Sequence, residues 1–147
     1  MKILVDADAC PVVNITVELC KKYSSECILL CDTAHIIQKD GASTLIFDKG
    51  ADSVDFALVN RVSPGDLVIT QDYGLAAMCL ARSATVLHQD GWRYTDQNIQ
   101  NLLFQRHMAR EHRAAGGRTK GPAKRTARQD QAFYDALESL LQHTVQG

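Results

Sequence analysis

Five short, strand-forming apolar runs alternate along this chain with segments of helical spacing. The runs are KILVD, ECILLCD, STLIF, DLVIT and ATVLH, at residues 2–6, 26–32, 43–47, 66–70 and 84–88. Runs that are apolar on both faces suit the strands of a parallel sheet that helices cover on both sides. The alternation therefore predicts an α/β fold with a doubly wound, mostly parallel sheet.

Helical patterns fill three of the four intervals between the runs. Pro11 suits a first helical turn, and apolar residues recur with helical spacing over residues 12–20. Segments 52–62 and 72–82 have the composition of two further helices. Each predicted helix lies between two predicted strands, as parallel crossovers require.

The last third of the chain has a different character from the α/β core. We expect one domain over residues 1–147, with the α/β core at 1–94 and C-terminal helices at 95–147. Thr95 suits the cap of a long helix, and Thr126 opens a capping box before a closing helix. Between these helices, residues 114–125 form a basic loop rich in glycine.

The sequence has the features of a cytoplasmic protein. After Lys2 the first apolar run is only three residues long, which is too short for a secretory signal. No window approaches the ~20 apolar residues of a membrane span. The five cysteines include no CxxC pair, so we expect reduced, packed thiols rather than disulfides or a zinc site.

Charge is distributed very unevenly, although the net charge is only −1. Residues 1–105 hold 13 acidic and 8 basic residues, whereas residues 106–128 hold 8 basic residues and one acidic residue, Glu111. Such clustering lets a chain of nearly neutral average charge present a site for a polyanion.

Acidic side chains follow three of the predicted strands. The residues concerned, with one hydroxyl, are Asp6, Asp8, Asp48, Asp52, Asp55, Thr70 and Asp72. The carboxyl ends of parallel strands meet at one edge of a sheet, where α/β proteins bind their ligands. In an extended chain Asp6 and Asp8 would point to the same side, and Asp52 and Asp55 would share a helix face.

Gathered carboxylates without matching cations suit a hard divalent ion such as Mg²⁺ or Mn²⁺. Two such ions ~3.5–4 Å apart can stabilise the attacking and leaving oxygens of a phosphodiester. Asp52 and Asp72 could instead simply cap helices. Asp6 has no such alternative role, because it ends a strand that is suited to burial.

The basic segment suggests contacts with a nucleic acid backbone, since bound Lys and Arg release counterions from phosphates. The residues that we expect to make these contacts are Arg118, Lys120, Lys124, Arg125 and Arg128. Trp92 and Tyr94 are candidates for stacking on bases, although Trp92 is equally suited to packing in the core. A solvated surface without a partner is the alternative for the whole segment.

The motifs ILVDADA, GADSVD and LVITQD together resemble the PIN-like and NYN nuclease superfamily. On that resemblance Asp6, Asp52 or Asp55, and Asp72 fall on the metal-binding acids, and Thr70 falls on the accompanying hydroxyl. From DADACPV to GGRTKGP the chain looks more closely like the YaiI/YqxD family of uncharacterised bacterial proteins. The pair of Asp6 and Asp8 belongs to this closer family.

The resemblance implies a PIN-like three-layer fold with a central, mostly parallel sheet flanked by helices and a C-terminal helical extension. It also implies a metal-dependent nuclease that acts on RNA or another single-stranded nucleic acid, with Mg²⁺ or Mn²⁺ as cofactor. Asp6, Asp52 and Asp72 would hold the ion, with help from Asp8 and Asp55. A homodimer is compatible with the sequence.

Two other functions stay open at this point. One is a catalytically silent module with a nucleic-acid-binding or regulatory role. The other is a haloacid-dehalogenase-like phosphatase, because DADAC resembles its DxDx[TV] loop, with Asp6 as the nucleophile. Against this phosphatase, position 10 is Cys, GADSVD precedes LVIT, and no lysine follows Thr70 before Lys120.

Overall fold

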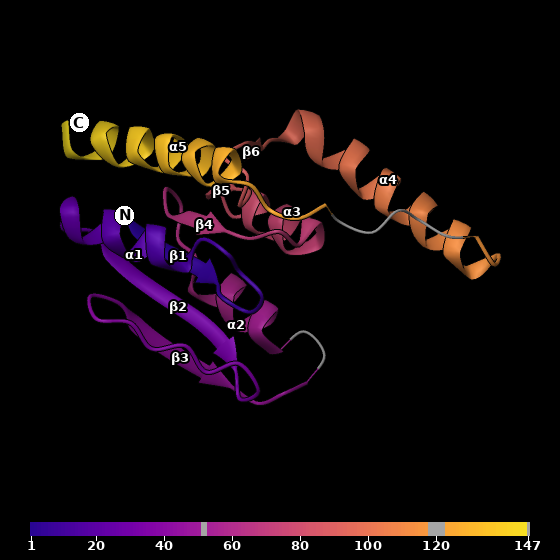
Figure 1. Cartoon of the computed structure of the whole chain (residues 1–147), viewed down its shortest axis with the longest axis horizontal. Helices are drawn as coiled ribbons and strands as arrows, with labels where there is room; N and C mark the ends of the chain where they lie inside the picture. The colour runs from indigo at the N-terminus through magenta and orange to yellow at the C-terminus, as the bar shows by residue number, and fades with distance from the viewer. Residues whose placement is uncertain (51–52, 118–122, 147) are drawn as a thin grey trace.

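The computed structural model describes residues 1–50, 53–117 and 123–146. Within these ranges it contains one six-stranded sheet (Figure 1). Its strands are β1 (Lys2–Asp6), β2 (Glu26–Asp32), β3 (Ser43–Phe47), β4 (Leu67–Ile69), β5 (Thr85–Leu87) and β6 (Arg93–Tyr94). The first five lie at the predicted runs, and β6 is an additional short strand.

Five helices accompany the sheet in the described part of the chain. They are α1 (Val13–Lys22), α2 (Ser53–Arg61), α3 (Tyr73–Ala81), α4 (Asp96–Ala114) and α5 (Ala127–Gln146). α1 begins two residues later than expected, because Pro11 lies in the turn that precedes the helix. The cap of α4 is confirmed, since the Thr95 hydroxyl accepts a hydrogen bond from the Asn98 N–H at 3.1 Å.

The strand order is β3-β2-β1-β4-β5-β6, and only β6 runs antiparallel to its neighbour. After β1 the chain moves outward through β2 and β3, then returns to place β4 on the other side of β1. The strand order therefore reverses between β1 and β4. In open α/β sheets the carboxyl end of such a switch point forms the ligand-binding crevice.

One face of the sheet is covered by α1 and α5. Side chains of β1 at Ile3 and Val5 pack there with Phe133, Leu137 and Leu141 of α5. α5 also closes over the turn between β5 and β6, because a Cβ at Gly91 would lie 2.6 Å from the Ala132 carbonyl oxygen. The closing helix is thus an integral part of one layer rather than a separate tail.

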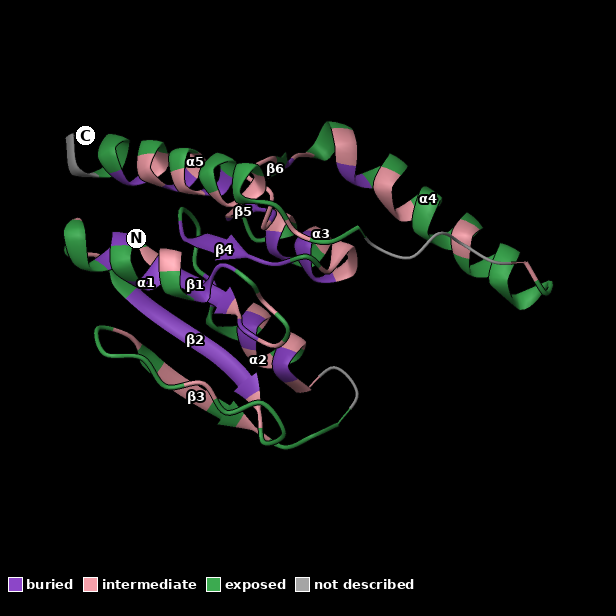
Figure 2. Ribbon diagram, viewed as in Figure 1, coloured by how far each residue is buried: buried purple, intermediate pink, exposed green. Residues whose placement is uncertain are grey.

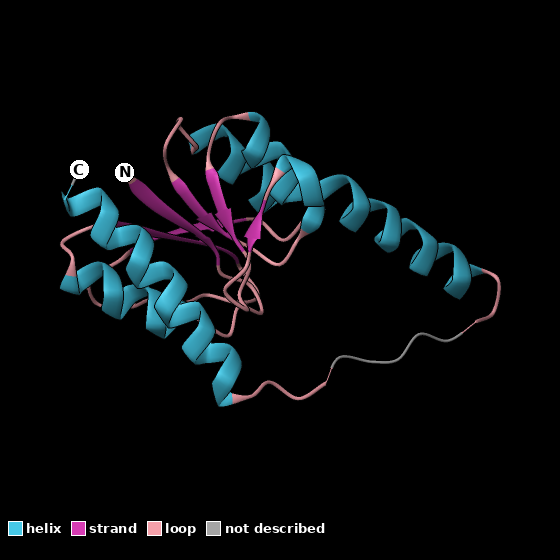
Figure 3. Cartoon of the chain, turned by 90° about the horizontal axis from the view of Figure 1, so that it is seen from above, coloured by secondary structure: helices cyan, strands magenta, loops and turns pink. Residues whose placement is uncertain are grey.

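The opposite face is covered by α2, α3 and the first turns of α4. Leu4 of β1 faces this side and packs in one core with Leu58 of α2 and Leu75 of α3. Ile99 anchors α4 to the same core. The result is three layers, with the sheet between two layers of helices (Figure 3).

Beyond its first turns, α4 projects away from the layers (Figures 1 and 3). Burial follows the same division, since β1, β2 and β4 are largely buried and the outer part of α4 is mostly exposed (Figure 2). The edge strand β3 is only partly buried. Phe104 and Met108 are two exposed apolar residues on this helix.

In the ranges that the structure describes, no helix is both long and apolar enough to cross a membrane.

Candidate functional site

A pocket of about 550 Å³ lies at the carboxyl edge of the sheet, beside the switch point. Its charged lining residues are Asp6, Asp8, Asp32, Asp55, Asp72 and Arg106. Arg106 is the one basic side chain among the described residues that line it. Five carboxylates from four segments of the chain therefore face a shared space with a single guanidinium.

Asp6 is the most perturbed of these carboxylates. It ends β1, and its Oδ2 accepts a hydrogen bond from the Thr70 hydroxyl at 2.9 Å. Burial raises the pKa of Asp6 from 3.8 to about 6, and the negative charges of Asp55, Asp72 and Asp8 add to the increase. The Thr70 hydrogen bond opposes it. Near neutral pH Asp6 therefore carries a charge in surroundings that disfavour it.

Thr70, the first residue after β4, is held at both ends. Its Oγ1 accepts a hydrogen bond from the Asp72 N–H at 3.0 Å while donating to Asp6, and its carbonyl oxygen accepts from the Tyr94 hydroxyl at 3.2 Å. The side chain is thereby fixed between the ends of β1 and β4. The motif TQD at residues 70–72 thus connects Asp6 at the end of β1 to the loop that follows β4.

Asp72 caps α3, which confirms one of its two interpretations, and it also lines the pocket. Its Oδ1 accepts hydrogen bonds from the N–H groups of Gly74 at 2.9 Å and Leu75 at 3.2 Å. The same oxygen lies 3.2 Å from Nη1 of Arg106 on α4. These three contacts fix the orientation of the carboxylate.

The GADSVD motif is only partly described. Asp55 lies in the first turn of α2, partly buried, and lines the pocket with Asp6 and Asp72. Asp52, which the resemblance placed among the metal-binding acids, lies outside the described residues. Asp48 is exposed and does not line the pocket.

Asp8 does not point the same way as Asp6. The expectation of a shared side assumed an extended chain, but β1 ends at Asp6 and a turn follows, with Ala9 at φ 55°. Asp6 contacts Thr70 after β4, whereas Asp8 Oδ1 accepts a hydrogen bond from the Asp32 N–H at the end of β2, at 3.3 Å. The two carboxylates therefore face opposite neighbours of β1 within the same pocket.

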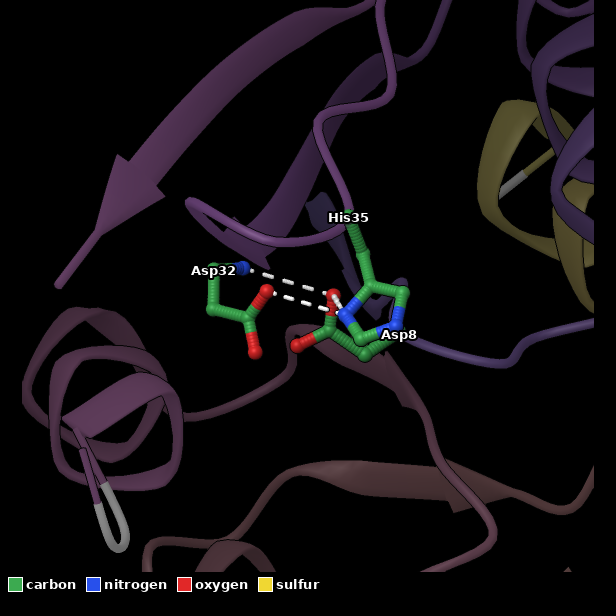
Figure 4. Close-up of side chains that lie close together, drawn as sticks. All are labelled: Asp8, Asp32 and His35. Atoms are coloured by element: carbon green, nitrogen blue, oxygen red, sulfur yellow. Dashed lines mark hydrogen bonds and ion pairs between the residues drawn. The ribbon is translucent and has the colours of Figure 1, made fainter. Parts of the chain in front are cut away.

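Asp32 and His35 join Asp8 in a second cluster that the sequence reasoning missed (Figure 4). Oδ1 of Asp32 lies 3.0 Å from Nδ1 of His35, which is 3.9 Å from Asp8 Oδ1. Among the described residues, this is the group whose ligand atoms all lie within 4.8 Å of one another. The sequence does hold a signal for Asp32, because this acid ends a buried strand just as Asp6 does.

The pKa values of these two acids move in opposite directions. Burial raises the pKa of Asp8, although the hydrogen bond from Asp32 opposes the change. Desolvation raises the pKa of Asp32, but hydrogen bonds from His35 and the Ala34 N–H lower it. The net result is a pKa below the ordinary value. Asp32, which lines the pocket, therefore holds its negative charge more readily than an ordinary aspartate.

The cations that we expected to bind phosphate have different surroundings. Arg118 and Lys120 lie outside the described residues, while Lys124 and Arg128 are exposed. Arg125 donates to Asp90 and Asp130 and to the Gln89 carbonyl, each at 2.7 Å. These contacts tie the start of α5 to the loop after β5.

A row of arginines lies on α4. Arg106 faces the pocket, and Arg110 and Arg113 follow at the i+4 and i+7 positions, so the three lie along one side of the helix. All three are exposed. They lead outward from the acidic pocket along the projecting helix.

The two aromatic residues proposed for stacking lie inside the fold. The expectation for Tyr94 is wrong, because Tyr94 is 1% exposed and donates to Thr70. Trp92 is partly buried and stacks on His88, with ring centroids 4.3 Å apart. An exposed aromatic residue next to the pocket is Phe56 of α2, which follows the pocket-lining Asp55 directly.

The comparisons with known proteins agree on one family. Residues 4–143 match the family model described as "Uncharacterized BCR, YaiI/YqxD family". A "UPF0178 protein" of Exiguobacterium sibiricum is 52% identical over 141 residues, which cover 96% of both chains. One from Ruminiclostridium cellulolyticum is 49% identical over 148 residues, covering 100% of this chain and 96% of the relative.

A third relative, from Clostridium acetobutylicum, is 46% identical over 143 residues, covering 96% of this chain and 97% of its own. No solved structure matches the chain. Since the family model spans nearly the whole chain and these relatives align along almost their full length, the chain belongs to the YaiI/YqxD family.

Proposed function

We propose that the pocket binds Mg²⁺ or Mn²⁺ and that the protein hydrolyses phosphodiester bonds in RNA or another single-stranded nucleic acid. The observation that carries the proposal is the lining of the pocket, which brings together five carboxylates and one guanidinium. Negative groups repel one another in a partly buried space unless a cation offsets their charge. The resemblance to PIN-like nucleases supports the same function.

The donor atoms fit a hard divalent cation. Carboxylate oxygens are preferred ligands of Mg²⁺, which also keeps several waters, so acids that line a pocket without touching can share one ion. Asp6, Asp55 and Asp72 would hold the ion, and Asp52 remains a predicted fourth ligand. A bound ion would polarise the phosphoryl group and generate the attacking hydroxide from water.

The surrounding residues would hold the acids and the substrate in place. Thr70 orients the Asp6 carboxylate through its hydroxyl, and the N-terminus of α3 orients Asp72. Asp8, Asp32 and His35 would hold a second ion, since their ligand atoms all lie within 4.8 Å of one another. Arg106 would transfer part of its interaction from Asp72 to a substrate phosphate.

The substitution Asp72→Asn tests this function. The Asn side-chain oxygen can still accept the hydrogen bonds that cap α3, so the fold should persist while one negative ligand is lost. We expect Mn²⁺-dependent cleavage of end-labelled single-stranded RNA to fall by about 100-fold or more in Asp72→Asn, because a metal ion supplies several kcal/mol of transition-state stabilisation.

The control variant is Asp40→Asn, since Asp40 is an exposed acid that pairs with Lys21 away from the pocket. It should cleave at the wild-type rate, and EDTA should stop both proteins. Equal rates for Asp72→Asn and wild type, or cleavage that ignores EDTA, would exclude the proposal. RNA binding without cleavage under any divalent ion would favour a silent binding module.

A further inference from the structure

An apolar groove of about 400 Å³ lies beside the acidic pocket, between α2 and α3. Its apolar side chains are Phe56 of α2 and Leu75 and Met78 of α3. Phe56 is 60% exposed, and Met78 is also exposed. Because Phe56 and Met78 line one groove together with charged residues, the groove is a candidate for a ligand surface.

The groove and the acidic pocket are continuous. Asp55, Asp72 and Arg106 line both of them, and Phe56 follows Asp55 directly on α2. Arg106 therefore lies at the boundary between an acidic space and an apolar one. A ligand that spans this boundary must carry an anionic part next to a flat or apolar part.

A nucleotide within a single strand has this combination of groups. Its phosphate is the anion that Arg106 and the ions of the pocket would bind, and its base offers a π-face to an aromatic ring. A base paired within a duplex keeps both faces stacked on its neighbours and does not offer them to the groove. The row formed by Arg106 and Arg110 supplies cations for the phosphates that follow.

We propose that the groove between Phe56 and Met78 binds an unpaired base next to the phosphodiester bond in the acidic pocket. This inference rests on the proposed function and adds a requirement, namely that the substrate has an unstacked base at this position. Phe56 supplies the stacking face, and the flexible Met78 side chain adapts to different bases. The groove therefore selects single strands without selecting a sequence.

Phe56→Ala and Phe104→Ala form a matched pair for the test. Phe104 lies on α4, is 61% exposed, and does not line the groove. Binding to a labelled single-stranded RNA, and to a strand of equal length with abasic sites, is measured by fluorescence anisotropy in Ca²⁺. We expect the wild-type protein to favour the base-bearing strand, and Phe56→Ala to bind it about 5- to 100-fold more weakly.

Phe56→Ala should bind the abasic strand as the wild type does, and Phe104→Ala should behave as wild type with both strands. Equal affinity of the wild type for both strands, or equal losses in both variants, would overturn the base site. A wild-type oligomer that dissociates in Phe56→Ala would show that a second copy covers the groove, which also overturns it. Circular dichroism confirms that both variants are folded.

Cleavage in Mn²⁺ is scored separately on the same strands, so the two proposals can fail independently. Base-dependent binding through Phe56 without any cleavage would remove the nuclease proposal and keep the base site. Cleavage of base-bearing and abasic strands at equal rates, with unchanged binding in Phe56→Ala, would keep the nuclease and remove the base site.

Discussion

Asp6→Asn is expected to lower Mn²⁺-dependent RNA cleavage by about 100- to 1,000-fold and, at the same time, to stabilise the metal-free protein at pH 8. The two effects have one cause. Asp6 is held as a carboxylate where burial and three neighbouring acids disfavour its charge. An uncharged amide removes that cost and removes the metal ligand with it.

The pH dependence of the stability follows from the direction of the pKa shift. In the folded protein the pKa of Asp6 is about 6, whereas in the unfolded chain it returns to near 3.8. Between these values the folded state binds the proton more tightly, so the contribution of Asp6 to the free energy of unfolding falls as pH rises from about 4 to 6. Two pKa units correspond to an upper limit of about 3 kcal/mol.

Urea unfolding of wild type and Asp6→Asn at pH 4 and pH 8 measures this difference. We expect the free energy of unfolding to be higher in Asp6→Asn at pH 8 and nearly equal to wild type at pH 4. Adding Mn²⁺ at pH 8 should stabilise the wild type alone. Asp48→Asn, which removes an exposed acid outside the pocket, should show none of these changes. A pH-independent difference would contradict the buried-charge account.

Phe133→Ala is expected to lower the free energy of unfolding by about 3–5 kcal/mol. Phe133 is fully buried on α5 and packs with residues of β1 and α1 in the core of one sheet face. Removing the ring leaves a cavity under a helix that packs on the same core through Leu137 and Leu141. The loss should loosen α5 as well as destabilise the domain.

Denaturant unfolding and amide hydrogen exchange over α5 measure both effects. Phe104→Ala serves as the control, because it removes the same ring from an exposed position and should change the free energy of unfolding by about 0.5 kcal/mol or less. A cost below 1 kcal/mol for Phe133→Ala would indicate that α5 does not close the core.

The strands could be predicted because their signal is local. Apolar runs such as KILVD mark strands, and the structure places β1 to β5 at those runs. The edge strand β3 lies at its run although it is only partly buried. The two-residue strand β6 carries no such run, since it needs only a short antiparallel pairing to β5. Strand order also has no local signal, so the switch point beside β1 emerges only from the folded chain.

The candidate site could be predicted only in part, for the same reason. Asp6, Thr70 and Asp72 were found because each follows a recognisable strand, and the structure brings them together. The turn after Asp6 directs Asp8 toward β2, which a pattern of alternating side chains cannot anticipate. The position of Arg106 at the pocket depends on the direction of α4, which the sequence does not reveal.

Diffraction from crystals of the protein soaked in Mn²⁺ tests whether Asp6 and Asp72 bind the same ion. We expect an anomalous difference peak within about 2.5 Å of carboxylate oxygens of both Asp6 and Asp72, with Asp55 contacting the same ion directly or through water. A second peak among Asp8, Asp32 and His35 would extend the account to two ions. The absence of any peak between Asp6 and Asp72 at saturating Mn²⁺ would contradict it.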